Sequence, residues 1–487
     1  MFAGSGSSGL SRSDWLAFAG VLAVAGWLRF YNLGRASLMI DESTYAWWLA
    51  NLPVVKMLDA LRQVGSNPPF YFLVLKLYSQ LVGESEFTLR SLSAGIDLLA
   101  VGVAFWLGWR LGRLPGALAC SLFWAVHPAL VWNARVARPY ALGSAISLLL
   151  LCLFLLLLEK RSAAGWFLAC LLLAIGLVNQ FFLFLTAAAL LMWAILRFRH
   201  DPSFFRSYSL VFIIALIPLS IWIYWFFQTD TPVIGTGWIR IPSVTDIGLT
   251  FWNLLSGYAG EFSLPSLIFG CLILLLVGLV VTSRKVPPDA RYALLCGVLL
   301  PVLAVWLISQ RRPLYIDRYF FSLYPFLALA LGYAGAEIWR FFQAHIPLSR
   351  TAFVGPVLVL VFSIGIWNAW QVQVDAKFDI EDWRGLVNYM KNSSQGDETV
   401  WLTEPEAEIA ISYYHPISKS ALIFSEKSTC PSTCWWVLRQ PYTMVHAYAQ
   451  GVSDPNRKWK PGIPAGCHLI DRWDSQSGVA LWKVHCE

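Results

Sequence analysis

Charged residues are scarce in this sequence. Asp, Glu, Lys and Arg together make up 13% of its 487 residues, whereas hydrophobic residues make up 57%. Because soluble proteins carry about 25% charged residues, this composition excludes an ordinary soluble protein and predicts a polytopic membrane protein. The net charge of +7 does not indicate a nucleic-acid partner, since Lys and Arg accumulate in the cytoplasmic loops of membrane proteins.

A small-residue cleavage site is also lacking after the first apolar run. Residues 1–13 are rich in Gly and Ser, which predicts a disordered segment that we expect on the cytoplasmic side. Without a cleavage motif, the run that follows is expected to stay in the membrane as the first helix.

Apolar runs long enough to cross a bilayer, about 20 residues each, predict about eleven transmembrane helices. They cover residues 14–33, 88–109, 115–132, 140–158, 163–179, 181–197, 208–227, 265–282, 291–309, 318–338 and 351–370. The run at 68–83 opens with two prolines and carries Lys76 near its middle. We expect it to lie in the interface, within a first outer loop at residues 34–87.

The basic residues between these runs predict the orientation. If the run at 68–83 does not cross, thirteen Lys and Arg residues collect in the cytoplasmic loops, against six in the opposite short loops after residue 110. Cytoplasmic loops carry the excess of such residues. In a plasma (inner) membrane, this orientation places Asp41, Glu42, the loop at 228–264 and the tail after residue 370 on the extracytoplasmic side.

The tail, residues 371–487, differs in composition from the rest. Its short segments TVWL and ALIF alternate with turn residues, which predicts a small soluble α/β domain. It contains four of the nine cysteines, Cys430, Cys434, Cys467 and Cys486. An even number in an oxidising compartment favours disulfides. Free thiols are the second alternative. A zinc site is the least favoured, because CPSTC is one residue longer than CxxC and Cys467 and Cys486 are far apart in the sequence.

Two arginine clusters lie on the side that the orientation rule disfavours. They are Arg135 and Arg138 in NARVARPYAL, and Arg311, Arg312 and Arg318 in SQRRPLYIDRYF. Arginines beside a membrane can reach lipid headgroups or pair with acids such as Asp317. Their clustering favours the other interpretation, a site for an anionic headgroup such as a phosphate, which matches the guanidinium donors.

Asp41 and Glu42 form an acidic pair in SLMIDESTYAWW. One interpretation is the start of an amphipathic interfacial helix, because acids in the first turn favour the helix dipole. The other is a general base whose pKa is tuned by neighbouring arginines. Such a base would accept a proton from an acceptor hydroxyl while a phosphate, stabilised by the arginines, leaves a sugar carbon.

An ordered set of motifs over residues 15–390 resembles a known family. The motifs are LRFYNLG, SLMIDESTYA, NPPFYFLVLKLYSQLVGESEFTLRSLSAG, RVARPYAL, YIDRYFFSLYPFLALALG and DWRGLVNYM. The sequence resembles the C-type (GT-C) glycosyltransferases that include protein O-mannosyltransferases and the aminoarabinose transferase of lipid A. It is most similar to their bacterial branch, which is like glycosyltransferase family 39 and is often labelled as lipopolysaccharide-core transferases.

The resemblance implies a polytopic GT-C membrane domain at residues 14–370 and an extracytoplasmic domain at 371–487. We expect no cofactor and no metal site. It implies inverting transfer of one hexose or pentose from a polyprenyl-phosphate donor to a lipid, glycan or protein acceptor. By the same resemblance Asp41 is the base, with Glu42 beside it. The implied donor-phosphate residues are Arg135, Arg138, Arg312 and Arg318, and the implied substrate-binding residues are Tyr45, Asn67, Tyr140 and Tyr319.

This chain departs from its relatives at Val136, where a glutamate is common. The acids that are candidates to replace it are Glu84, Glu86 and Glu261.

Two further segments have hypothetical roles. The loop at 228–264 closes over the site, and DWRGLVNYM docks the soluble domain on the membrane part or contacts the acceptor. The competing functions are a transporter or flippase of a lipid-linked sugar and a catalytically inactive scaffold. A flippase would show several polar residues at mid-bilayer or paired broken helices.

Overall fold

The computed structural model describes residues 9–64, 68–228, 239–257, 263–345, 354–374, 381–393, 399–402, 406–415, 422–424, 430, 432–439, 466–475 and 479–486. The chain divides into two compact units. The first comprises Met1–Tyr31, Val54–Val74 and Ser91–Gln373, and the second comprises Asn32–Pro53, Leu75–Arg90 and Val374–Glu487. The second unit therefore combines parts of the predicted first outer loop with the C-terminal region.

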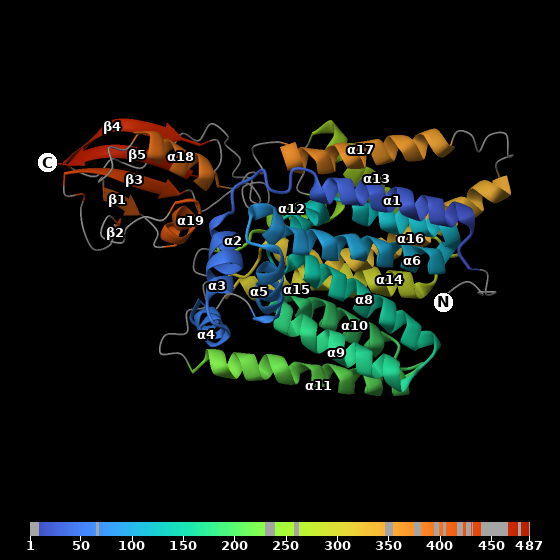
Figure 1. Ribbon diagram of the computed structural model, residues 1–487. Coiled ribbons are helices and arrows are strands. Elements are labelled where there is room, and N and C mark those ends of the chain that lie inside the picture. Colours follow the sequence, from blue (N-terminus) through green and yellow to red (C-terminus); the bar gives the residue numbers. More distant parts are fainter. Residues whose placement is uncertain are drawn as a thin grey trace. The chain divides into compact units, whose positions relative to one another are not determined.

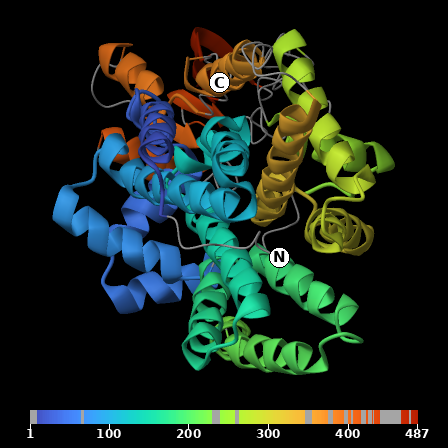
Figure 2. The ribbon, with the colours of Figure 1, turned by 90° about the vertical axis from the view of Figure 1, so that its right-hand side faces the viewer.

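Helices build the first unit (Figure 1). In chain order they are α1 (Arg12–Phe30), α4 (Val54–Val64), α6 (Glu86–Val126), α7 (Pro128–Ala134), α8 (Tyr140–Glu159), α9 (Ala163–Asn179), the 3-10 helix η2 (Phe181–Leu183), α10 (Phe184–Leu196), α11 (Pro202–Phe226), α12 (Val244–Ser256), α13 (Leu264–Thr282), α14 (Pro288–Leu294), the π-helix η3 (Leu295–Leu299), α15 (Leu300–Ser309), the 3-10 helix η4 (Asp317–Leu323), α16 (Tyr324–His345) and α17 (Val354–Val374). Only the ends of α6 and α17 extend into the second unit. In Figure 2, α8 to α11 appear as teal and green helices packed side by side.

Six helical stretches among the described residues are long and apolar enough to cross a membrane. They are Glu86–Val126, Tyr140–Glu159, Pro202–Phe226, Leu264–Thr282, Pro288–Ser309 and Asp317–Ala344. Each predicted apolar run coincides with a helix, because in lipid a helix satisfies every backbone hydrogen bond within one segment. The predicted polytopic helical architecture is confirmed, and the number of eleven crossings stays a prediction.

A sharp reversal interrupts α6. Gly112 and Arg113 leave the helical conformation, and Arg113 has a φ of 55°. A Cβ at Gly108 would lie 2.1 Å from the carbonyl oxygen of Gly116, whereas a straight helix separates residues eight apart by about 12 Å. The chain therefore turns back on itself, and α6 is a helical hairpin whose two arms correspond to two separate predicted runs.

The doubtful run at 68–83 forms α5 (Phe70–Val82). Its 13 residues span only about 20 Å at 1.5 Å per residue, which is less than the hydrocarbon core. This length is compatible with the predicted interfacial position.

The second unit contains a five-stranded sheet (Figure 1). Its strands are β1 (Thr399–Leu402), β2 (Leu422–Phe424), β3 (Thr433–Arg439), β4 (Cys467–Asp474) and β5 (Val479–Cys486), in the order β2-β1-β3-β5-β4. β1 pairs in parallel with β2 and β3, and β5 pairs antiparallel with β3 and β4. With the helices α18 (Trp383–Ser393) and α19 (Ala407–Tyr414), this sheet confirms the predicted α/β domain, in which TVWL forms β1.

Alternate residues of the central strands enter two cores, because successive strand residues point to opposite faces. Val400 and Trp435 join the core that contains residues of α18 and α19, whereas Trp401 and Trp436 join the core on the other face. The first core also contains Ile40, from the one-turn helix α2 (Ile40–Glu42) that precedes the π-helix η1 (Ser43–Trp48) and α3 (Leu49–Asn51).

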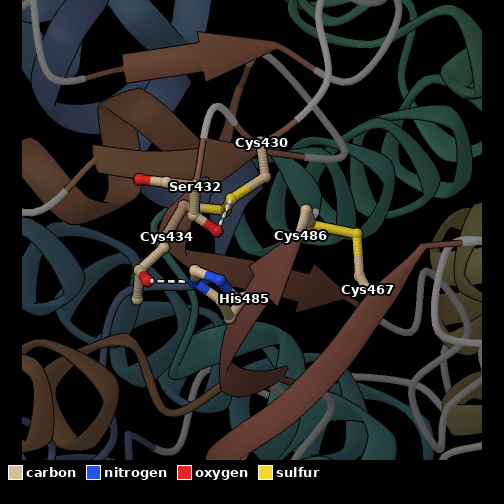
Figure 3. The surroundings of a disulfide bond; sticks show 7 residues. Cys430, Ser432, Cys434, Cys467, His485 and Cys486 are labelled. Carbon is tan, nitrogen blue, oxygen red and sulfur yellow. Dashed lines mark hydrogen bonds between the residues drawn. A yellow bond between two sulfur atoms is a disulfide. The ribbon is translucent and has the colours of Figure 1, made fainter.

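Disulfides join the four cysteines of this domain in two pairs (Figure 3). Cys430 bonds to Cys434, and Cys467 bonds to Cys486. The second bond links directly paired residues of the antiparallel strands β4 and β5. The disulfide prediction is confirmed, in preference to zinc or free thiols.

Candidate active site

The acid segment, residues 34–42, belongs to the second unit. It ends in α2, where Asp41 is partly buried and Glu42 is fully buried. The two neighbouring carboxylates therefore have different surroundings. Tyr45 follows them in η1 and is also buried.

Arg90, in the first arm of α6, holds the acid segment through all five of its N–H donors. Its Nε and Nη2 donate to the two carboxylate oxygens of Glu42, at 2.9 and 2.6 Å. The remaining donors bind the backbone carbonyls of Leu33, Ala36 and Ser37 at 3.2, 2.8 and 2.8 Å. Arg90 is 4% exposed and Glu42 is 0% exposed. This buried ion pair fixes the path of the chain that leads to Asp41.

Four of the predicted site residues meet in the first unit. Arg138 is 5% exposed and precedes Pro139 and Tyr140 at the start of α8. The Arg318 guanidinium lies 5.7 Å from the centroid of the neighbouring Tyr319 ring. The helix η4, which carries both residues, packs against α8, where the Tyr140 and Phe321 rings lie 6.0 Å apart. This anion cluster, as we call Arg138, Tyr140, Arg318 and Tyr319, combines two guanidinium groups with two phenol hydroxyls, a donor set that suits a phosphate.

Aromatic rings and a close helix contact hold the anion cluster. The Tyr319 ring stacks on Phe182 with centroids 4.1 Å apart, and the Arg138 guanidinium lies 6.0 Å from the Phe72 ring. α8 approaches η4 so closely that a Cβ at Gly143 would lie 2.4 Å from the Phe321 ring. Glycine at this position lets two segments far apart in sequence bring their site residues together.

Asp317, next to Arg318, is held by uncharged partners. Its carboxylate accepts hydrogen bonds from Thr250, at 2.6 Å, and from Asn253 of α12. Tyr315 in turn donates to the Thr250 hydroxyl at 2.9 Å. These contacts do not support the interpretation that the arginines neutralise Asp317. Asp317 instead links η4 to α12 by hydrogen bonds. The helix α12 is part of the predicted lid loop at 228–264. Residues 229–238 and 258–262 of that loop lie outside the described residues.

The other two predicted phosphate-binding arginines lie differently. Arg135 donates from Nη1 to the carbonyls of Arg29 and Tyr31 at 2.9 and 2.8 Å, and so stabilises the C-terminal end of α1. Arg312 is exposed on the turn after α15. Of the four arginines, Arg138 and Arg318 are the two brought into one cluster.

The remaining predicted residues are distributed as follows. Asn67 and Glu261 lie outside the described residues. Val136 is buried. Glu84 accepts a hydrogen bond from Asn51 at 3.1 Å, and Glu86 pairs with Arg384, all within the second unit. Among the described residues, no group of three or more His, Cys, Asp or Glu side chains could hold a metal ion.

Two residues that hold predicted site residues, one in each unit, were not predicted. Arg90 lies within the quoted motif LRSLSAG, where a charge at the start of an apolar run is the signal that could have identified it. Phe182 follows Asn179 and Gln180, and no pattern in the sequence indicates that it stacks on Tyr319.

The comparisons with known proteins agree with this architecture. The family model of dolichyl-phosphate-mannose-protein mannosyltransferases matches residues 66–225, a range that contains Arg90, Arg135, Arg138 and Tyr140. No curated protein matches the sequence. The fold is that of the GT-C glycosyltransferases, and the chain is a multi-pass membrane protein.

The fold assignment rests on similarity to solved structures. The chain is similar to ArnT from Cupriavidus metallidurans bound to undecaprenyl phosphate, with a TM-score of 0.60, 13% identity, and coverage of 97% of this chain and 98% of that chain. It is also similar to the archaeal oligosaccharyltransferase AglB from Archaeoglobus fulgidus, in complex with an inhibitory peptide and a dolichol-phosphate. There the TM-score is 0.50, the identity 10%, and the coverage 82% of this chain and 63% of that chain. The predicted resemblance is confirmed.

Proposed function

We propose that this protein is an inverting membrane glycosyltransferase. It transfers one sugar from a polyprenyl-phosphate donor to a hydroxyl of a cell-envelope lipid or glycan on the extracytoplasmic face of the inner membrane. The anion cluster is the observation that carries this proposal, because it gathers two arginines and two tyrosines from distant segments. Two structures of similar fold contain a polyprenyl phosphate, undecaprenyl phosphate in ArnT and dolichol-phosphate in AglB.

The reaction proceeds by a single displacement. The acceptor oxygen attacks the anomeric carbon from the face opposite the phosphate, and Asp41 takes the proton from the acceptor hydroxyl. The bond between the anomeric carbon and the phosphate oxygen breaks, and the electron pair leaves with the polyprenyl phosphate. Attack from the opposite face inverts the configuration. Arg138 and Arg318 stabilise the charge that grows on the leaving phosphate, so a general acid is not required.

The residues divide into those that react and those that position. Asp41 is the base, and Tyr140 and Tyr319 donate hydrogen bonds to the donor. Glu42 is a positioning residue, because both of its carboxylate oxygens are bound by Arg90. Arg135 is better explained as a capping residue of α1 than as a phosphate ligand.

A buried charge pair bears on the flippase alternative. Arg29 and Asp97 form a fully buried ion pair, and Trp124 Nε1 donates to Asp97 at 3.0 Å. The remaining Arg29 donors bind the carbonyls of Ala25, Trp124 and Ala125. The pair is satisfied by the protein and links α1 to α6, which is the pattern of a structural link rather than of a transport path.

The test is analysis of the glycans and lipids of a deletion strain by mass spectrometry. The strain is complemented with the wild type, with Asp41→Asn, or with an empty vector. We expect one glycosylated product to disappear on deletion, to return with the wild type, and to remain absent with Asp41→Asn. The membrane must contain the variant at the wild-type level. Full restoration of the product by Asp41→Asn would contradict the assignment of the base.

A further inference from the structure

Side-chain oxygens accept hydrogen bonds from three consecutive backbone N–H groups just before Asp41. The N–H of Leu38 donates to the Tyr414 hydroxyl at 2.8 Å, that of Met39 to the Glu42 carboxylate at 3.2 Å, and that of Ile40 to the Glu381 carboxylate at 2.6 Å. The N–H groups at the start of a helix need such partners, because no carbonyl of the helix reaches them. Two of the three partners, Tyr414 and Glu381, come from the C-terminal domain, by which we mean the described residues from Glu381 onward, with α18, α19 and β1–β5.

The side chain of Ile40, the residue directly before Asp41, is part of the core of this domain. It is 6% exposed and clusters with Trp383 and Leu386 of α18, Ile411 of α19 and Trp435 of β3. Ile40, an apolar residue of the acid segment, is therefore part of the core of a domain that lies more than 340 residues later in the chain. Close packing of that core leaves Ile40 little freedom to shift.

The predicted docking motif DWRGLVNYM supplies a second set of contacts. Ser37 Oγ donates to Asp382 at 3.2 Å and accepts from the N–H of Arg384 at 3.1 Å. The Arg384 guanidinium donates to the carbonyls of Arg35 and Gly34 at 3.1 and 3.2 Å. These contacts fix the beginning of the acid segment, and those of Ile40, Glu381 and Tyr414 fix its end.

We propose that the C-terminal domain is a positioning element of the active site. Ile40, Glu381 and Tyr414 fix the backbone at Asp41, and the domain is required for transfer without contacting substrate itself. This inference rests on the proposed function, in which Asp41 is the base. Its physical basis is that a reacting group displaced by about 1 Å can lose about 100-fold in rate.

The test uses the full-length protein in nanodiscs and three variants. Tyr414→Phe removes one hydroxyl and keeps the ring, and Glu381→Ala removes the carboxylate. Glu381→Gln keeps an acceptor oxygen and is the conservative rescue. The matched control is Tyr389→Phe, since the Tyr389 hydroxyl donates to Asp471 of β4 at 2.8 Å and not to a residue of the acid segment.

The first measurement is hydrogen–deuterium exchange at residues 37–42. We expect about tenfold faster exchange in Tyr414→Phe and Glu381→Ala, because each releases a backbone N–H from its side-chain acceptor. Exchange should be unchanged in Glu381→Gln and Tyr389→Phe, and strands β3 and β5 should remain protected in all variants. Unchanged exchange at 37–42 in both Tyr414→Phe and Glu381→Ala overturns the inference.

The second measurement separates positioning from binding. The amount of glycosylated product in the complemented deletion strain is expected to fall about tenfold or more with Tyr414→Phe and Glu381→Ala. Binding of undecaprenyl phosphate, measured on the purified variants, should stay within about twofold of the wild type. Product at the wild-type level, or equal losses in product and binding, overturns the inference. If Asp41→Asn still forms product, the proposed function fails instead, so the two failures are distinguishable.

Discussion

Replacement of Arg90 by methionine is the most direct test of how the acid segment is held. Methionine keeps an apolar stem of similar length but removes all five donors. Glu42 is then left as a fully buried carboxylate without its charged partner, although it still accepts a hydrogen bond from the N–H of Met39. Three backbone carbonyls, those of Leu33, Ala36 and Ser37, lose their partner at the same time.

The magnitude follows from burial. Removing one partner of a buried ion pair costs about 3–5 kcal/mol, because the remaining charge is uncompensated. An exposed pair is worth about 0–1 kcal/mol. Arg472 and Asp474 form such a pair in the same unit, with side chains 40% and 25% exposed. Arg472→Met is therefore the matched control. The difference in unfolding free energy between Arg90→Met and Arg472→Met measures the effect of burial.

Thermal unfolding of the purified protein, followed by tryptophan fluorescence, provides the assay. The second unit has about 150 residues, and for that size each kcal/mol shifts the midpoint by about 2–4 °C. We expect Arg90→Met to lower the midpoint by about 6–20 °C, and Arg472→Met to leave it nearly unchanged. Adding Glu42→Gln to Arg90→Met should recover part of the loss, since the buried charge is removed. Equal midpoints for Arg90→Met and Arg472→Met would refute the reasoning.

Two further predictions concern the phosphate and the disulfides. Arg138→Lys keeps the charge but loses the planar guanidinium, and should weaken undecaprenyl phosphate binding about tenfold. Titration of the purified protein measures the affinity, with Arg340→Lys at an exposed position as the control. Equal affinities of the two variants would show that Arg138 does not bind the phosphate. Cys467→Ser opens a bond with a sequence separation of 19 and should destabilise the C-terminal domain by about 3 kcal/mol. Denaturant titration without reductant tests it, and an unchanged midpoint would show that the Cys467–Cys486 bond does not stabilise the domain.

Much of the membrane architecture was predictable from local composition. The runs at 140–158 and 265–282 became α8 and α13 with nearly the predicted ends, since a long apolar run in lipid has few alternatives to a helix. TVWL became β1 for a similar local reason, namely its enrichment in residues that favour strands. Even the reversal in α6 was anticipated as the gap between two runs.

The candidate site was predictable only as a set of residue types. Arg135 and Arg138 are three residues apart in one motif, and no property of the sequence separates them. The chain turns between α7 and α8, so Arg135 binds the carbonyls of α1 whereas Arg138 lies with Arg318 and Tyr319. Local patterns report the type of environment that a side chain requires, but not which distant group supplies it.

Glu42 and the cysteines illustrate the same division. The acidic pair SLMIDESTYA indicated a functional position, and the count of four cysteines indicated disulfides. Only the tertiary structure decided that Glu42 is bound by Arg90, that Ile40 enters the C-terminal core, and which cysteines pair. The physical reason is that hydrophobic burial acts on each segment according to its own composition, whereas ion pairs, backbone capping and disulfides need two specific groups within a few ångströms. Their meeting depends on how the whole chain packs.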